Sequence, residues 1–585
     1  MALSPPRPAN VDASLVRGRS RLRIVAVTFA IAFGSIALRL IDMVDLADKG
    51  QPMPVAQEET AEPAIPPPEA VAIDGERAEI TDRNGVVLAT NMRVPGVHAD
   101  PSQLVDKAAA ARQLAAILPG VDAAELQQRL EAGRRFAWIK HRITPEEQKA
   151  VLELGLPGVE FSMADQRVYP KERLAGHVTG FVDVDNRGRA GIERYFDDRL
   201  RRGGEPVALS LDVRIQQVVH DELDDAYRRF RAIGANAMVL DRITGELLAM
   251  VSLPDFDPNR VGDVRKTEYL NRNVGGVYEL GSVFKLLTVA AALDSGQISL
   301  HDKFDATGKL QIGRYRIGDD HAKNRWLSVP EIFEYSSNIG AARIAFAAGG
   351  GPMLESFFHR IGFYAPADIE LAESVRSRTP RRWPDVTVAT TSFGHGIAVT
   401  PLQFLDAAAG LVGDGTRVPT TLLKRTGTAD LPRTRFVDAR TADLMRWLMW
   451  LVVEQGTGTQ AKLDSYLIGG KTGTAEKPEG RTYSNTKVLA SFLGAFPIDA
   501  PRYLVLVSLD EPQGDAKSHG LRVGGWTAAP VAAAIIDRIG PILGVSPTPP
   551  GVAQQMRARL AAFQPVASVS SSVQEASFAL GSARR

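Results

Sequence analysis

Cysteine is missing from the 585-residue chain, and neither sign of charge is in excess, since 69 Lys and Arg residues face 68 Asp and Glu residues. The first absence excludes thiol nucleophiles, disulfide scaffolds, iron–sulfur clusters and cysteine-based zinc sites. The second removes the main argument for a nucleic-acid partner, because binding to phosphates depends on counterion release from a basic face. We therefore expect no nucleic-acid function.

Two common catalytic motifs are also missing. The nine histidines include no H-E-x-x-H zinc motif, and the chain has no G-x-x-x-x-G-K-[ST] phosphate loop. Asp319, Asp320 and His321 stand together and could suggest a metal, but their polar surroundings favour an exposed turn. What the chain does have is an ordinary globular composition, 44% hydrophobic and 23% charged, so a sizeable core is possible.

The N-terminal segment predicts a membrane anchor. Residues 1–23 contain five arginines and one acidic residue, Asp12, and an apolar run, Ile24–Val44, follows them. As a helix this run would be about 31 Å long, which matches the thickness of a bilayer core. Arg39 near its far end can extend to the interface. The arginines predict that residues 1–23 stay in the cytoplasm and that the rest lies outside the membrane. The alternatives are a cleaved signal peptide and a buried helix, but no convincing cleavage site follows the run.

Changes in composition divide the remainder of the chain. Gln51–Glu69 is rich in Pro and Glu and is typical of a linker, whereas the segment after Gly544 is rich in Pro and Ser, with one helix expected around Val552–Phe563. Between them, a mixed region of about 140 residues precedes a larger α+β domain of about 330 residues. The predicted parts are a cytoplasmic tail (1–23), a transmembrane helix (24–44), a linker (45–70), the mixed region (71–205), the larger domain (206–543) and a C-terminal tail (544–585).

Local signals predict several elements inside these regions. Helices are expected where a capping residue precedes an amphipathic pattern, and strands where short apolar runs stand between turn signals. The predicted helices are capped at Thr144, Asp212, Ser328 and Thr400; the predicted strands are Ala237–Leu240 and Glu246–Val251, joined by a hairpin at Ile243–Gly245, and Val488–Phe496 and Tyr503–Leu509.

Ser282 and Lys285 are the strongest candidates for a nucleophile and its base. They stand three residues apart at the start of a strongly helical run, so they share one helix face. In the first turn, free N–H groups and the helix dipole favour developing negative charge. Burial would depress the pKa of Lys285, and the neutral amine could then take the hydroxyl proton. A second S-x-x-K, Ser484–Lys487, lies in a polar stretch and is expected to be a solvated loop.

Two later motifs strengthen this hypothesis. Ser336 begins an S-x-N motif, in which its hydroxyl could relay a proton and Asn338 could hold an amide substrate. Lys471–Thr474 follows a predicted strand, and Gly473 would let the backbone approach a ligand. A similar segment, Arg425–Thr428, lies among polar residues and is expected to be a turn. S-x-x-K, S-x-N and K-T-G in this order recur in penicillin-binding proteins and serine β-lactamases.

The segment Tyr278–Lys285 resembles the active-site segment of class B penicillin-binding proteins, and the resemblance extends over most of the chain beyond the anchor. Similar motifs of that family, which soluble β-lactamases lack, are found at Arg77, Ile80–Gly85, Arg167–Pro170 and Gly188–Phe196. Without the resemblance, Asp82–Gly85 would be interpreted as a turn and Glu193 as a surface charge. The family motifs imply a non-catalytic pedestal that holds the catalytic domain away from the membrane.

One further segment, Ser392–Gln403, is closer to the division-specific, FtsI-type branch of the family than to the elongation branch. The modest length of the region before the catalytic motifs favours the same branch. The chain departs from the common pattern at His395 and at Glu476, but neither departure touches the three catalytic motifs. We therefore expect a septal enzyme.

The resemblance implies an α+β fold of the serine β-lactamase/transpeptidase type, with an antiparallel sheet flanked by helices, after an elongated α+β pedestal (71–205, dimerisation-type) and one transmembrane helix. The catalytic residues implied are Ser282, Lys285, Ser336, Asn338 and Lys471, and the substrate-binding residues are Thr472, Gly473 and Thr474. Backbone N–H groups of Ser282 and Thr474 would form the oxyanion hole. No metal and no cofactor is implied.

The implied reaction is peptide cross-linking in the bacterial wall. Ser282 attacks the penultimate carbonyl of a stem peptide ending in D-Ala-D-Ala, D-Ala leaves, and the amine of a neighbouring stem peptide resolves the acyl-enzyme. Lys285 would act as the base in acylation, and Ser336 and Lys471 would pass the proton to the leaving amine. The implied partners are these stem peptides, β-lactam antibiotics, which mimic D-Ala-D-Ala, and an FtsW-like glycan polymerase with other division proteins. The implied location is the inner membrane at the septum, with a periplasmic catalytic domain.

Other interpretations remain beside this one. An elongation-type transpeptidase shares the catalytic motifs. A β-lactamase or D,D-carboxypeptidase would hydrolyse the acyl-enzyme, and Glu370 and Glu373 supply acids before the K-T-G motif but not the expected E-x-x-x-N pattern. A β-lactam sensor would need several membrane spans. A silent scaffold would tolerate loss of catalytic residues, whereas Ser282, Lys285 and Lys471 are all present here.

Overall fold

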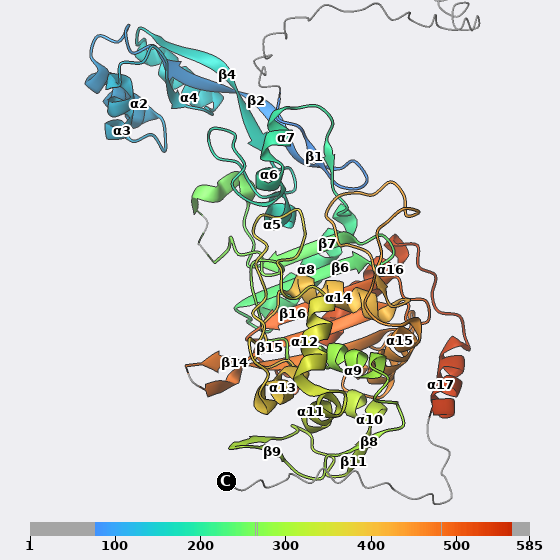
Figure 1. The fold of residues 1–585 in the computed structure, drawn as a ribbon. Helices are drawn as coiled ribbons and strands as arrows, with labels where there is room; N and C mark the ends of the chain where they lie inside the picture. The colour runs from blue at the N-terminus through green and yellow to red at the C-terminus, as the bar shows by residue number, and fades with distance from the viewer. Residues whose placement is uncertain (1–75, 264, 266, 481, 564–585) are drawn as a thin grey trace, which may run out of the picture. The chain divides into compact units, whose positions relative to one another are not determined.

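A computed structural model describes residues 76–563 except 264, 266 and 481 (Figure 1). The predicted cytoplasmic tail, the predicted span Ile24–Val44 and the Pro-rich linker lie outside the described residues, as does the end of the C-terminal tail. Within the described part, none of the helices combines the length and the apolar character that crossing a membrane requires.

The first described region, residues 76–208, is a mixed α+β structure built on one sheet. Its strands run in the order β3-β2-β1-β5, and β4 pairs with β2. Apolar side chains on one face of this sheet, such as Val97 and Ala99, pack against Leu114 and Leu126 of the helices. The elements are β1 (Ile80–Thr81), β2 (Val87–Ala99), α2 (Lys107–Ile117), α3 (Ala123–Glu131), β3 (Ala137–Lys140), α4 (Pro145–Leu154), β4 (Val159–Val168), η1 (Glu172–Ala175), α5 (Gly176–Thr179), α6 (Gly191–Tyr195), α7 (Asp197–Arg201) and β5 (Val207–Ala208).

A buried ion network holds the base of this region together. Glu193 is fully buried and accepts from Nε of Arg77 at 2.6 Å and from Nε of Arg167 at 2.7 Å. The interpretation of Glu193 as a surface charge is therefore wrong, because two guanidinium groups replace the water that a lone carboxylate would need. The predicted turn at Asp82–Gly85 is confirmed, and Asp82 also accepts from the backbone N–H of Val213 at 3.1 Å.

The second region, residues 209–563, is built on a five-stranded antiparallel sheet in the order β14-β15-β16-β6-β7. Its main strands are β6 (Gly234–Asp241), β7 (Glu246–Leu253), β14 (Gly469–Glu479), β15 (Thr482–Phe496) and β16 (Tyr503–Asp510). Its main helices are α8 (Val213–Arg229), α9 (Lys285–Asp294), α10 (Val329–Glu334), α11 (Asn338–Ala347), α12 (Gly350–Arg360), α13 (Asp385–Ser392), α14 (Pro401–Val412), α15 (Ala439–Glu454), α16 (Ala528–Ile542) and α17 (Val552–Phe563). Smaller elements are η2 (Pro258–Asp263), η3 (Gly281–Phe284), β8 (Lys303–Asp305), β9 (Leu310–Ile312), β10 (Tyr315–Ile317), β11 (Trp326–Ser328), β12 (Thr416–Arg417), β13 (Thr434–Arg435) and η4 (Thr459–Ala461).

Both faces of this sheet are covered by helices, which confirms the predicted architecture. In β6, Ala237 and Val239 join the apolar core that contains α8 and α16, whereas Met238 and Leu240 join the core that contains α9, α14 and α15. The alternation follows from the two-residue repeat of a strand. Because both faces are buried, the strand is apolar at nearly every position rather than at every second one.

Most of the local predictions are confirmed. Thr144 and Glu147 form a capping box at α4, Asp212 caps α8, and Thr400 accepts from the Gln403 N–H at the start of α14. Ser328 and Glu331 form the capping box predicted at α10, whereas the one predicted for Thr400 and Gln403 is incomplete, because the Gln403 amide donates to the Gly362 and Ala365 carbonyls instead. The strands β6, β7, β15 and β16 and the helix α17 are also present, with the β15 boundary six residues earlier than predicted.

Candidate active site

The three motifs meet at one edge of the sheet. Ser282 lies in the single 3-10 turn η3, which leads directly into α9; Asn338 begins α11; and Lys471–Thr474 lies on the edge strand β14. The turn can approach the strand because Gly281 has a φ of +59° and no side chain, and a Cβ there would meet the Thr474 carbonyl oxygen at 2.4 Å. The backbone thus places the serine beside the strand.

Lys285 is the group nearest to the Ser282 hydroxyl. Its side chain is fully buried, and its Nζ lies 2.9 Å from Oγ of Ser282. The same Nζ lies 2.5 Å from the Ser336 carbonyl oxygen and 2.7 Å from Oδ1 of Asn338. Burial lowers the pKa of Lys285 to about 7, although Asp319 and Asp320 partly oppose the shift. The predicted burial of Lys285 is confirmed.

This geometry selects the direction in which the proton moves. A carbonyl and an amide oxygen can only accept hydrogen bonds, so Ser336 O and Asn338 Oδ1 take two N–H groups of Lys285. In the neutral amine the lone pair then remains for the two neighbouring hydroxyls, that of Ser282 at 2.9 Å and that of Ser336 at 3.1 Å. The neutral amine is therefore within reach of the Ser282 hydroxyl and has no N–H left to donate to it.

Ser336 connects the two buried lysines. Its Oγ lies 3.1 Å from Nζ of Lys285 and 3.0 Å from Nζ of Lys471. Ser336 has a φ of +60°, an unusual conformation for a residue with a side chain, and it directs the carbonyl and the hydroxyl of one residue to the same lysine. Burial, and then the charge of Lys285, lowers the pKa of Lys471 well below its usual value. The Ser336 hydroxyl is thus within hydrogen-bonding distance of both lysine amines.

Asp319 holds the S-x-N motif in place, a role that the sequence did not indicate. Its two carboxylate oxygens accept from the Ser337 hydroxyl at 2.6 Å and from the N–H groups of Asn338 and Ile339 at 2.6 and 3.0 Å. The expected exposed turn is correct for Asp320 and wrong for Asp319, which is partly buried as a helix cap. His321 is exposed like Asp320. The described part of the chain holds no cluster of His, Asp and Glu suited to a metal ion.

The segment Lys471–Thr474 brings its backbone and the hydroxyls of Thr472 and Thr474 to the site. The Thr472 hydroxyl lies 2.7 Å from that of Thr457, and the Thr474 hydroxyl accepts from the Gly524 N–H at 3.1 Å. A Cβ at Gly473 would meet the Leu280 carbonyl oxygen at 2.6 Å. Glycine is therefore required for the strand to lie against the turn that carries the nucleophile.

The second S-x-x-K segment, Ser484–Lys487, and the R-T-G-T segment, Arg425–Thr428, lie outside this site. Ser484 and Lys487 are in strand β15, where Ser484 is buried and Lys487 pairs with Glu479 at 2.8 Å. The prediction of a solvated loop is wrong, because this polar segment completes the β14–β15 ladder. Arg425–Thr428 has no helix or strand, as expected, and contributes nothing to the site.

The two acids considered for hydrolysis have structural roles. Glu370 accepts from the Thr421 hydroxyl at 2.5 Å and from the Leu422 N–H at 2.8 Å. Glu373 accepts from the N–H of Gly191, in the first region, at 2.8 Å. Neither carboxylate is directed to a water beside Ser282 by these contacts.

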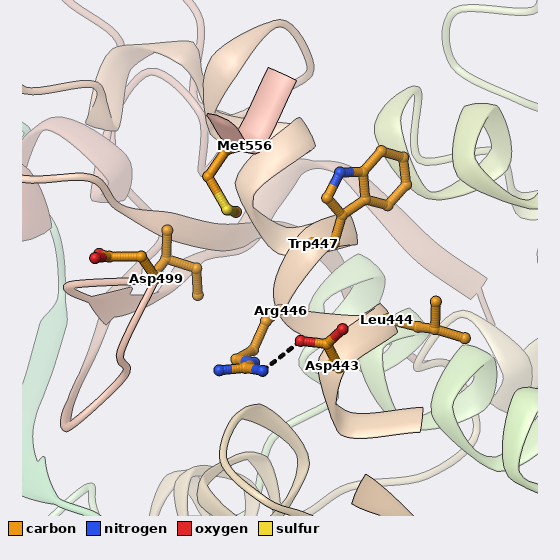
Figure 2. A pocket seen from close by; sticks show the side chains of 7 residues that line it. Asp443, Leu444, Arg446, Trp447, Asp499 and Met556 are labelled. Atoms are coloured by element: carbon orange, nitrogen blue, oxygen red, sulfur yellow. Dashed lines mark hydrogen bonds and ion pairs between the residues drawn. The ribbon is translucent and has the colours of Figure 1, made fainter. Parts of the chain in front are cut away.

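A separate pocket lies beside the C-terminal helix and contains no motif residue. Figure 2 shows Met556 of α17 facing α15, where Asp443 and Arg446 form an ion pair. The lining residues are Asp443, Leu444, Arg446, Trp447, Ile498, Asp499 and Met556. This pocket is not part of the site formed by the three motifs.

Comparison with known proteins gives matches over nearly all of the described chain. The model of the penicillin-binding protein transpeptidase domain matches residues 235–537, and that of the penicillin-binding protein dimerisation domain matches residues 72–207. A probable peptidoglycan D,D-transpeptidase FtsI of Caulobacter vibrioides is 40% identical, covering 81% of this chain and 83% of that protein. The peptidoglycan D,D-transpeptidase FtsI of Escherichia coli K12 is 29% identical, covering 80% and 84%.

A solved structure shares the fold. Penicillin-binding protein 3 of Mycobacterium tuberculosis, complexed with aztreonam, aligns with a TM-score of 0.63 and 24% identity, covering 82% of this chain and 98% of that one.

Proposed function

Because the chain belongs to the penicillin-binding transpeptidases of the FtsI type, we propose that it cross-links peptidoglycan stem peptides during septal wall synthesis through a serine acyl-enzyme. The observation that carries this proposal is the 2.9 Å approach of the buried Lys285 amine to the Ser282 hydroxyl. Burial keeps a fraction of this lysine neutral near neutral pH, so the site contains its own base.

Acylation uses the groups on both sides of Ser282. Lys285 takes the hydroxyl proton while Oγ attacks the penultimate carbonyl of D-Ala-D-Ala. The developing oxyanion is stabilised by the N–H groups of Ser282 and Thr474, and Asn338 orients both Lys285 and the substrate amide. Lys471 together with Thr472 and Thr474 binds the terminal carboxylate.

Departure of D-Ala requires a proton on its nitrogen. The contacts of Ser336 Oγ with Lys285 and Lys471, at 3.1 and 3.0 Å, support a path along which the proton taken from Ser282 reaches the leaving amine. The amine of a neighbouring stem peptide then attacks the ester carbonyl, and the same path returns a proton to Ser282.

Hydrolysis is the competing outcome, and it is less well supported. Class A β-lactamases use a glutamate to activate the deacylating water, whereas Glu370 and Glu373 accept hydrogen bonds that stabilise the fold. The same site would react with β-lactams, which resemble D-Ala-D-Ala, and would stay acylated.

The remaining parts of the chain have supporting roles in this proposal. Residues 71–205 form the pedestal and residues 206–543 the transpeptidase domain, anchored in the inner membrane by Ile24–Val44 with the catalytic domain in the periplasm. An FtsW-like polymerase would supply the glycan strand at the septum.

The proposal is tested by the Ser282→Ala variant of the full-length protein. This change should abolish covalent labelling by a fluorescent penicillin and the release of D-Ala from stem peptides, because it removes the proposed nucleophile, the hydroxyl that lies 2.9 Å from the Lys285 amine. Ser484→Ala is the matched control, since it removes the serine of the other S-x-x-K, and it should label normally. Undiminished labelling of Ser282→Ala would disprove the assignment.

Two further measurements separate the alternatives. Steady D-Ala release without an acceptor amine would indicate a carboxypeptidase. A fluorescent fusion that follows the sidewall rather than midcell would indicate an elongation enzyme.

A further inference from the structure

A link between two chain segments lies beside the nucleophile, apart from the three motifs. One carboxylate oxygen of Glu279 accepts from the Tyr483 hydroxyl at 3.2 Å and from the Gly396 N–H at 3.0 Å. Glu279 stands three residues before Ser282, and Tyr483 lies on β15, the strand paired with β14. The link therefore joins the segment that carries the nucleophile to the strand pair that carries the K-T-G motif.

The third member of the link is the segment after α13. Tyr278 and Val399 form an antiparallel bridge, and the Gly281 N–H donates to the Gly394 carbonyl at 3.3 Å. A Cβ at Gly394 would meet the Gly281 carbonyl oxygen at 2.2 Å, so the two segments are in direct backbone contact. The Gly396 N–H that reaches Glu279 is thus fixed relative to Ser282.

His395 closes the space between these segments. Its ring meets that of Tyr483 edge to face at 5.3 Å, and burial, with the nearby charge of Lys285, lowers its pKa to about 4. Burial and Glu279 raise the pKa of Tyr483 to about 12, so the hydroxyl keeps its proton and remains a donor. At neutral pH the cluster consists of a neutral ring, a neutral phenol and the Glu279 carboxyl.

We propose that Tyr483 is a positioning residue, which holds β15 against the segment carrying Ser282 through its hydrogen bond to Glu279 and thereby limits hydrolysis of the acyl-enzyme. This inference rests on the proposed function, because it concerns the fate of the Ser282 ester. In hydrolysis, water attacks the acyl carbonyl, the bond to Ser282 Oγ breaks, and the water proton passes through Lys285 to that oxygen.

The hydrogen bond of Tyr483 should affect hydrolysis and aminolysis differently, because water and a peptide amine have different requirements for attack on the ester. A peptide amine must be bound in one orientation to attack, whereas water needs only access to the ester. Tyr483 is 42% exposed, so solvent reaches the side chain that makes the link to Glu279. Without its hydrogen bond, β15 can move away from Glu279, and water gains access while the acceptor loses part of its binding surface.

The test compares the full-length protein with its Tyr483→Phe variant, which keeps the ring and loses the hydroxyl. After labelling with fluorescent penicillin and removal of the excess, the variant should lose its label roughly fivefold faster, the effect expected for loss of one ordinary hydrogen bond. Acylation should change by less than about twofold, since the hydroxyl touches none of the reacting atoms. With a D-alanyl thioester as donor and D-alanine as acceptor, the ratio of hydrolysis to aminolysis should rise by a similar factor.

Two controls make the result specific to the link. Lys487 lies on the same strand as Tyr483, and Lys487→Gln removes its ion pair with Glu479. The acyl-enzyme of this variant should therefore hydrolyse at the wild-type rate. In a Glu279→Gln background, Tyr483→Phe should have a smaller effect than in the wild type, because the carboxyl group that accepts the bond has been replaced. Three results would overturn the proposal. The Tyr483→Phe variant could lose its label at the wild-type rate, Lys487→Gln could accelerate this loss as much as Tyr483→Phe does, or the effects of Tyr483→Phe and Glu279→Gln on the rate could be fully additive. Loss of all labelling in the wild-type protein would instead contradict the proposed function.

Discussion

Lys285 shows how burial changes the chemistry of a single residue. In water a lysine is a cation at neutral pH, but here its amine is fully buried and its pKa is lowered to about 7. Two acceptors, Ser336 O and Asn338 Oδ1, take its N–H groups, so its lone pair faces the hydroxyls of Ser282 and Ser336. Protonation of Lys285 would therefore remove the proposed base.

This property predicts a pH dependence for acylation. Below the pKa of about 7 the amine is protonated and cannot accept the serine proton, so the rate should fall about tenfold for each pH unit. Above pH 7 the rate should reach a plateau. The rate of acylation by fluorescent penicillin, followed by stopped flow from pH 5.5 to 8.5, measures this profile, with circular dichroism as a check on folding. Equal rates at both ends would show that Lys285 is not the base.

At the same scale, Asp319 marks what the sequence could not reveal. The serine, lysine and asparagine positions could be predicted because their spacing reflects helix geometry and the order of the motifs. Asp319 acts from 18 and 19 residues away on Ser337 and Asn338, and no periodic pattern encodes such a contact. The left-handed backbone conformation of Ser336 could not be predicted from the sequence either, because serine does not favour that conformation.

Strand β14 shows how one element serves both the fold and the site. Its pairing with β15 places Lys471 opposite Leu493 and Thr474 opposite Ala490, so an apolar partner strand supports the polar motif. The turn η3 packs against the other side of β14 through Gly281 and Gly473. Element types can be predicted from apolar runs and capping residues. The polar segment Ser484–Lys487 instead predicts a loop, because its pairing in the sheet depends on residues of another strand.

This close approach predicts a strong effect of Gly473→Ala. The added Cβ would meet the Leu280 carbonyl at 2.6 Å and Val283 Cγ1 at 2.9 Å, so β14 must move away from Ser282. Acylation by fluorescent penicillin should fall by at least about 100-fold, because a displacement on the order of 1 Å is enough to disrupt catalytic geometry.

Gly427→Ala is the control, since it makes the same change in a similar R-T-G-T segment and its Cβ would meet no described atom within 4 Å. This variant should acylate like the wild type. Equal activity of the two alanine variants would contradict the packing argument.

For the whole molecule, the two described regions are joined by specific polar contacts. Asp82 accepts from Val213, Asn84 donates to Asp212 at 3.1 Å, and Glu373 accepts from Gly191. Composition and motifs were enough to predict an α+β catalytic domain preceded by a mixed region. These contacts could not be predicted, since each joins residues more than 120 positions apart.

The predicted anchor and the chemistry should be separable. A chain starting near Val71 keeps both described regions, so it should be soluble, folded and acylated by penicillin at close to the full-length rate. It should still fail to support septation, because confinement to the membrane raises the effective concentration of the site near its lipid-linked precursor. Complementation by this shortened chain, exported in soluble form, would show that the segment Ile24–Val44 is dispensable. Failure to acylate would show that the two regions depend on it.

The structural roles of Glu370 and Glu373 also bear on how drug resistance can evolve in this protein. A β-lactamase-like escape needs an acid that is free to activate water, yet recruiting Glu370 would release Thr421 and Leu422, and recruiting Glu373 would release Gly191. Each such step would reduce folding stability before it produced any turnover of the drug. Selection should therefore favour substitutions that slow the first reaction with the antibiotic over substitutions that destroy it.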